Sequence, residues 1–168
     1  MKRTIERLAP VVTGDLPFDD WTIPRELWEE LRPMLRAGML TLECGSGLST
    51  LLFDAAGCRH TALEHDRAFA VKSDSVVLVS LAGSPPWYDW KPTHPYDLVL
   101  VDGPPRHSGG RDGIMRVFGR LVHPTTVVIL DDTNRPAERR LADWICRQFQ
   151  FQPTHHLQQG RGFSVLTP

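Results

Sequence analysis

Apolar residues follow two alternating spacings along the chain, which predict helices and strands in turn. From Pro24 to Leu35 they recur at helical spacing, so we expect an amphipathic helix that ends near Gly38. Strands are then expected at 39–43, 61–64, 76–81, 96–102 and 125–130, and helices at 48–56, 67–71, 113–122 and 137–149. Strands that alternate with helices in this way predict βαβ units and a mostly parallel sheet.

The C-terminal end departs from this alternation. Two further strands are expected at 151–157 and 163–167, and only residues 158–162 separate them. A parallel crossover needs about a dozen residues or more, so these two strands must pair antiparallel as a hairpin that closes the sheet. The predicted fold class is α/β, with a three-layer α/β/α Rossmann-like architecture. We expect one domain over residues 1–168, in which residues 1–38 form a helical extension or lid.

Composition and charge narrow the classes of function. The 168 residues carry 19 Lys and Arg against 20 Asp and Glu, a formal net charge of −1. This balance argues against electrostatic capture of nucleic acid or of an acidic membrane surface. The apolar runs are too short to span a membrane, and the charged N-terminal residues do not resemble a secretory signal. We therefore expect a cytoplasmic protein with neither a membrane nor a nucleic acid partner.

The loop after the first expected strand has the composition of a ligand cradle. In the segment Glu43-Cys-Gly-Ser-Gly-Leu-Ser-Thr50, the two glycines allow a sharp turn and a close approach of backbone to ligand. The start of the next helix offers free N–H groups at the same place. Glu64 ends the second strand, where a carboxylate can accept both hydroxyls of a ribose. The alternative is a structural turn followed by an ordinary exposed glutamate.

The details of this loop disfavour a pyrophosphate ligand. The dinucleotide-binding pattern has a third glycine where this chain has Thr50, and a phosphate-binding Walker loop would end in Gly-Lys-Ser or Gly-Lys-Thr.

Four segments in order resemble the class I S-adenosylmethionine-dependent methyltransferases over about residues 22–168. They are Glu43 to Thr50, Glu64-His-Asp66, Tyr96-Asp-Leu-Val-Leu-Val-Asp-Gly-Pro-Pro105 and Val127-Val-Ile-Leu-Asp-Asp132. The cofactor-binding residues that this resemblance implies are Glu43, Gly45, Ser46, Gly47, Ser49, Thr50, Glu64, His65, Ser80, Leu81, Asp102 and Gly103. In this scheme Glu64 would hold the ribose diol, Ser80 and Leu81 would border the adenine, and Asp102 with Gly103 would lie at the methyl-transfer edge.

Three carboxylates are expected to meet on the opposite side of the cofactor. Asp102 ends the fourth strand, and Asp131 with Asp132 ends the fifth. Like charges placed side by side repel one another unless a cation neutralises them, and hard oxygen ligands suit Mg²⁺. The pattern is similar to the metal-dependent catechol and caffeoyl-type O-methyltransferases, although that pattern has Asn at position 132 and Lys at position 105. The alternative is a set of solvated carboxylates.

His107 follows Asp102 on the same loop and is the candidate general base, the alternative being an exposed loop histidine. The sequence thus predicts S-adenosylmethionine-dependent methyl transfer to a small-molecule acceptor, at a hydroxyl oxygen, with Asp102 and His107 as catalytic residues and a divalent metal assisting. The rival hypotheses are a non-catalytic S-adenosylmethionine-binding module and a nicotinamide-dependent oxidoreductase. The acceptor pocket would use the N-terminal segment and the loops 83–95 and 104–113, or a homodimer would complete it.

Overall fold

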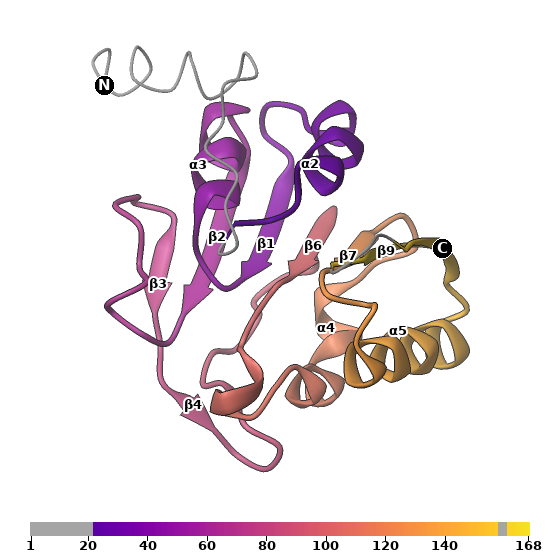
Figure 1. The fold of residues 1–168 in the computed structure, drawn as a ribbon. Helices are drawn as coiled ribbons and strands as arrows, with labels where there is room; N and C mark the ends of the chain where they lie inside the picture. Colours follow the sequence, from indigo (N-terminus) through magenta and orange to yellow (C-terminus); the bar gives the residue numbers. More distant parts are fainter. Residues whose placement is uncertain (1–21, 158–160) are drawn as a thin grey trace.

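A seven-stranded sheet forms the centre of the molecule (Figure 1). The computed structural model describes residues 22–157 and 161–168. The strand order is β3-β2-β1-β6-β7-β9-β8. The parallel strands are β1 (Leu40–Cys44), β2 (Arg59–Glu64), β3 (Val76–Leu78), β6 (Leu98–Val101) and β7 (Val127–Leu130). The antiparallel pair is β8 (Gln152–His156) and β9 (Phe163–Thr167), with β9 also antiparallel to β7. The predicted sheet and its terminal hairpin are confirmed.

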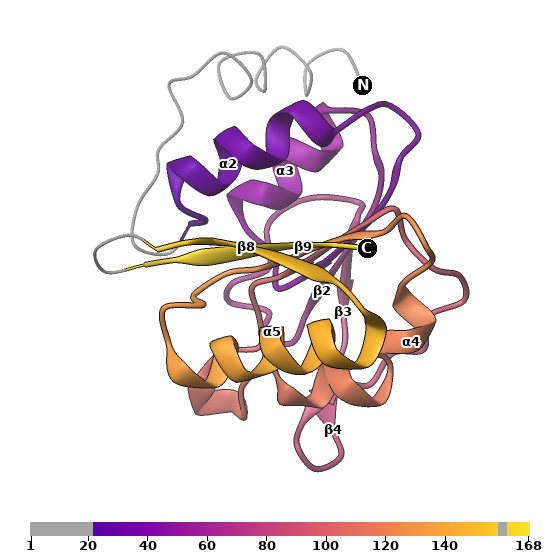
Figure 2. The same cartoon turned by 90° about the vertical axis from the view of Figure 1, so that its right-hand side faces the viewer.

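Helices cover both faces of this sheet, which gives the predicted three layers (Figure 2). On one face lie α2 (Arg25–Leu31), the short 3-10 helix η1 (Arg32–Met34) and α3 (Leu48–Ala55). On the other lie the 3-10 helices η2 (Arg106–Ser108) and η3 (Asp112–Arg116), followed by α4 (Phe118–Leu121) and α5 (Pro136–Phe149). None of the helices that the structure describes is both long and apolar enough to cross a membrane.

The central strands are apolar on both sides because both of their faces are buried. Leu98 and Leu100 of β6 pack with the side chains of α2 and α3, whereas Val99 and Val101 pack with those of α4 and α5. Successive side chains of a strand point to opposite faces, so one run of four apolar residues supplies both cores. Trp28, in the N-terminal extension, belongs to the core that α2 and α3 form with Leu98 and Leu100. Residues 1–21 of that extension lie outside the described part of the chain.

Three local predictions were wrong. The expected helix at 67–71 is a turn, because the carboxylate and carbonyl of Asp66 accept the N–H groups of Ala68 and Phe69. The expected helix at 113–122 is divided at Val117 into η3 and α4. The expected strand at 76–81 ends at Leu78, and a separate hairpin follows, formed by β4 (Leu81–Ala82) and β5 (Trp87–Tyr88). Pairing in this hairpin also orders part of the stretch expected to be a loop.

Candidate functional site

A cavity of about 260 Å³ opens at the carboxyl ends of β1, β2 and β6. One side, here called the cofactor half, is lined by Gly45, Ser46, Glu64, His65, Asp66 and Phe69. The other side, the acceptor half, is lined by Asp102, Gly103, Pro105, His107, Arg111, Asp132, Arg135 and Arg161, and Tyr88 also borders the cavity. Ligands of open parallel sheets bind at this edge.

The Gly45 loop comes close to the strand beside it. Gly45 has φ +104°, a conformation that side chains rarely adopt, and its N–H donates to the carbonyl of Leu63 over 2.8 Å. A Cβ at Gly45 would lie 3.6 Å from the backbone nitrogen of Gly103, which is an ordinary contact distance. The positive φ is therefore what favours glycine at this position, where the two halves of the cavity adjoin.

The carboxylate of Glu64 accepts hydrogen bonds from several backbone N–H groups. Its Oε1 accepts the backbone N–H groups of His65 and Asp66 at 2.7 and 2.9 Å, and its Oε2 accepts that of Ser46 at 3.1 Å. The side chain is almost fully buried and still lines the cavity. Its orientation is therefore fixed before any ligand binds.

His65 links the two halves of the site. Its Nδ1 lies 3.1 Å from Oε1 of Glu64, and its Nε2 lies 3.1 Å from the hydroxyl of Ser108, on the loop that follows β6. The sequence predicted that both Glu64 and His65 bind the cofactor, and both line the cavity, whereas the contact to Ser108 was not predicted.

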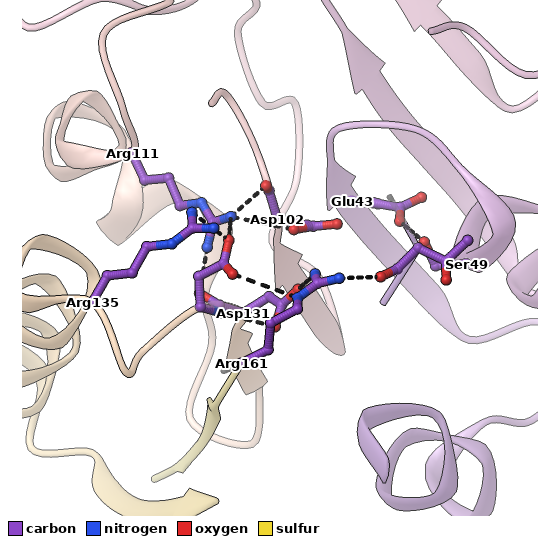
Figure 3. A network of polar contacts seen from close by, with 9 residues as sticks. Glu43, Ser49, Asp102, Arg111, Asp131, Arg135 and Arg161 are labelled. Atoms are coloured by element: carbon purple, nitrogen blue, oxygen red, sulfur yellow. Dashed lines mark hydrogen bonds and ion pairs between the residues drawn. The ribbon is translucent and has the colours of Figure 1, made fainter. Parts of the chain in front are cut away.

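Three other residues of the predicted cofactor set lie beneath the loop rather than in the cavity. The buried carboxylate of Glu43 accepts hydrogen bonds from the hydroxyls of Ser49 and Thr50, the latter over 2.6 Å. Thr50 in turn accepts the N–H of Gly47 over 3.0 Å. These contacts fix the start of α3 under the loop; the contact between Glu43 and Ser49 is on the right of Figure 3. Gly47 begins α3 and does not line the cavity either.

Ser80 and Leu81 are also outside the cavity. Ser80 is exposed after the end of β3, and Leu81 pairs with Tyr88 and packs against the core. The prediction placed them at the end of one continuous strand, and the break after Leu78 removes the reason for that placement.

The predicted convergence of Asp102, Asp131 and Asp132 is present. One oxygen of each carboxylate lies within 4.8 Å of the others, with Asp131 and Asp132 buried. Asp102 and Asp132 line the cavity, and Asp131 lies behind them. Asp132 adopts the left-handed conformation with φ 62°, which aspartate tolerates better than most residues.

Three arginines surround these carboxylates (Figure 3). Arg111 donates through Nη2 to Oδ2 of Asp132 at 2.8 Å, to Oδ1 of Asp102 at 3.2 Å and to the backbone carbonyl of Asp102 at 2.6 Å. Arg135 contacts Oδ2 of Asp132 at 2.8 Å, and Arg161 contacts Oδ2 of Asp131 at 2.5 Å. We call these six side chains the Asp–Arg cluster.

Solved structures that resemble this chain include methyltransferases. A methyltransferase from Pyrococcus furiosus superposes with a TM-score of 0.57 at 17% identity, over 99% of this chain and 96% of that one. The chain has the class I S-adenosylmethionine-dependent methyltransferase fold. No family model and no curated protein matches the sequence.

Two further structures with the methyltransferase fold cover nearly the whole chain. A precorrin-6y C5,15-methyltransferase from Geobacter metallireducens has a TM-score of 0.58 at 14% identity, over 91% of this chain and 93% of its own. A protein assigned as a caffeoyl-CoA O-methyltransferase from Staphylococcus aureus has a TM-score of 0.57 at 14% identity, over 98% and 92%. At these identities the likeness establishes the fold.

The donor set of the Asp–Arg cluster fits a resident metal poorly. The carboxylates are close enough to share an ion, but Oδ2 of Asp132 already has two guanidinium partners, and Oδ2 of Asp131 has one. Oδ1 of Asp131 accepts the N–H of Asp132 over 2.8 Å. Arginine side chains therefore place positive charge beside all three carboxylates, and the metal ion stays a prediction.

The environment of Asp102 favours its protonated form. Burial first, and the neighbouring Asp131 second, raise the pKa of the Asp102 carboxyl to about 8, although Arg111 acts in the opposite direction. Burial also raises the pKa of the Tyr88 phenol well above its usual value, with the charge of Glu64 contributing. Tyr88 is therefore a neutral hydroxyl at any ordinary pH.

The sequence-based predictions did not include the arginines or Tyr88. A signal for two of the arginines was present, because a cluster of three acids needs a counter-charge and Arg111 and Arg135 follow closely after the predicted carboxylates. Arg161 lies in the connection of the terminal hairpin, far from them in the sequence. Tyr88 gave no such signal, since a tyrosine among the prolines and tryptophans of 83–95 indicates packing as readily as a site.

Proposed function

We propose that the protein transfers a methyl group from S-adenosylmethionine to a hydroxyl oxygen of a small-molecule acceptor. The observation that carries this proposal is the cavity itself, which places the Gly45 loop and Glu64 opposite Asp102 and Gly103 within the methyltransferase fold. The Staphylococcus aureus protein with this fold is assigned as an O-methyltransferase, which adds support for an oxygen acceptor.

The residues of the cofactor half fit S-adenosylmethionine. Glu64 offers a fixed carboxylate for the two ribose hydroxyls, and Gly45 with Gly103 leaves a backbone surface free of side chains. Ser46 and His65 border the same space. When bound, the cofactor supplies a methyl group activated by a positively charged sulfur.

The acceptor half offers a base and a charged wall. His107 is exposed on the cavity wall, where a nitrogen of a neutral imidazole accepts the proton of an acceptor hydroxyl as its oxygen attacks the methyl carbon. Asp102, held by Arg111, lies on the same side. Much of the rate would come from positioning the acceptor in line with the methyl group. Metal assistance stays a prediction, and none of these roles requires it.

Binding of S-adenosylhomocysteine, measured by titration calorimetry, tests the cofactor assignment. Glu64→Gln keeps the shape of the side chain but removes the charge, so we expect binding weakened roughly tenfold or more. Glu138→Gln is the matched control, because Glu138 is equally buried but does not line this cavity. Unchanged affinity in Glu64→Gln would place the ribose elsewhere.

The two rival functions give different results in the same assays. A nicotinamide-dependent oxidoreductase would bind NAD in preference to S-adenosylhomocysteine. A non-catalytic binding module would bind S-adenosylhomocysteine, but it would form none from S-adenosylmethionine with any of a panel of phenols and alcohols. Turnover with at least one hydroxyl acceptor is the result that the proposal requires.

A further inference from the structure

The hydroxyl of Tyr88 is a buried polar group whose partner is missing. The residue is only 3% exposed, it borders the cavity, and its oxygen has no hydrogen-bond partner among residues 22–157 and 161–168. Most buried hydroxyls are paired, because burial removes their hydrogen bonds to water. A buried hydroxyl without a partner on a cavity wall indicates that a ligand bound in the cavity supplies the missing hydrogen-bond partner.

The hairpin that carries Tyr88 is held firmly against the rest of the protein. Arg116 of η3 donates to the backbone carbonyls of Ala82, over 3.0 Å, and of Pro85. A Cβ at Gly113 would lie 2.4 Å from the carbonyl oxygen of Pro86, so only glycine allows η3 to pack this closely on the hairpin. The connection from β3 to β6, all of it in the described part of the chain, holds this hairpin in place of a helix, and β4 lies below the sheet edge in Figure 1. Tyr88 is therefore positioned before a ligand arrives.

The hydroxyl lies at the boundary between the two halves of the site. A Cβ at Gly103 would lie 2.6 Å from the Tyr88 oxygen and 3.3 Å from Cα of Gly45, so the phenol sits directly against the point where the two glycine backbones meet. The ring of Tyr88 also packs edge-on against that of His65, with centroids 6.2 Å apart. Of these neighbours, Gly45 and His65 belong to the cofactor half, and Gly103 is the residue of the acceptor half that adjoins it.

We propose that Tyr88 is a cofactor-positioning residue whose hydroxyl donates a hydrogen bond to the bound S-adenosyl ligand at the floor of the cavity. This inference rests on the proposed function, because it takes the ligand of the cofactor half to be S-adenosylmethionine. The phenol is a donor here since burial keeps it protonated. The cofactor, rather than the acceptor, is its partner because the oxygen is buried against Gly45 and Gly103.

Tyr88→Phe tests this by removing one oxygen from an otherwise unchanged ring. We expect S-adenosylhomocysteine to bind roughly three- to tenfold more weakly, the usual loss for one neutral hydrogen bond. The ligand-free variant should melt no lower than the parent protein, because the hydroxyl has no partner to lose. Tyr96→Phe is the matched control: Tyr96 is 1% exposed in the same core cluster and does not line the cavity, so the affinity should stay at the parent value.

Two results would overturn the inference, and they are distinguishable. If the parent protein binds S-adenosylhomocysteine and Tyr88→Phe binds it equally well, the hydroxyl has no role toward the cofactor, and a lower melting temperature of the free variant would identify a structural role. If the parent protein itself does not bind S-adenosylhomocysteine, the proposed function fails and the inference fails with it.

Discussion

The two halves of the cavity are built by different kinds of interaction. In the cofactor half, backbone N–H groups and hydroxyls hold single carboxylates, as at Glu64 and beneath the loop at Glu43. In the acceptor half, guanidinium groups hold carboxylates in an extended network of opposite charges. The first arrangement depends on glycine and hydroxyl residues at fixed spacing, so it can be recognised in the sequence as a short motif. The second depends on where long arginine side chains reach in the folded protein, so no short sequence motif identifies it.

The Asp–Arg cluster should be the more fragile half, and Arg111 is its centre. The side chain is almost fully buried and contacts both Asp102 and Asp132, so Arg111→Ala leaves two neighbouring carboxylates without their shared partner. We expect the free energy of unfolding to fall by about 3–5 kcal/mol, as for other buried pairs that lose one member. Urea denaturation measures the loss.

Arg106→Ala is the matched control for this experiment. Arg106 is exposed on η2, within the same loop, and its removal should change stability by no more than about 0.5 kcal/mol. If Arg111→Ala were as stable as Arg106→Ala, the cluster would be a solvated set of charges, which is the alternative that the sequence left open.

The contrast between the halves also explains what the sequence predicted and what it did not. The sheet follows from the alternation of strands and helices, and its terminal hairpin follows from the short connection between the last two strands. The positions of Glu64 and of the three aspartates follow from where strands end, because parallel strands bring their carboxyl ends to one edge. Tyr88 could not be predicted this way, since its hairpin is placed by packing against η3 rather than by a strand of the main sheet.

The position of Ser49 and Thr50 illustrates a second limit. Hydroxyls at the start of a helix indicate hydrogen bonding, but the residue types do not say whether the partner is a ligand above the loop or a carboxylate below it. Here Glu43 is that partner. A buried acid at the end of a strand competes for the same donors.

The titration of Asp102, in the acceptor half, should make the free energy of unfolding depend on pH. Its pKa in the folded protein is raised to about 8, whereas an unfolded aspartate titrates near 4. Between these values the folded chain keeps a proton that the unfolded chain releases, so the stabilising contribution of this group is present at low pH and is lost as the pH rises toward 8. Asp102→Asn removes this dependence.

Melting temperatures at pH 5 and pH 8.5 give the measurement. The difference between Asp102→Asn and the parent protein should be more favourable to the variant at pH 8.5 than at pH 5, by about 2–4 °C for each kcal/mol that the retained proton contributes. Asp112→Asn, from the exposed start of η3, controls for the loss of a carboxylate from the same loop. A difference that does not change with pH, or that changes in the opposite direction, would contradict the raised pKa.

The smallest expected effect is the change in melting temperature on adding a divalent cation. This measurement decides whether arginine side chains or a metal ion neutralise the Asp–Arg cluster. Because an arginine already contacts one oxygen of each of the three carboxylates, adding millimolar Mg²⁺ to EDTA-treated protein should raise the melting temperature by less than about 1 °C. Asp131→Asn should lower the melting temperature equally with and without Mg²⁺, because it weakens the contact to Arg161 in both cases. A rise of several degrees in the parent protein that is absent from Asp131→Asn would instead support the metal predicted from the sequence. The arginines would then have to leave the carboxylates when the ion binds, and the acceptor half would be a metal site after all.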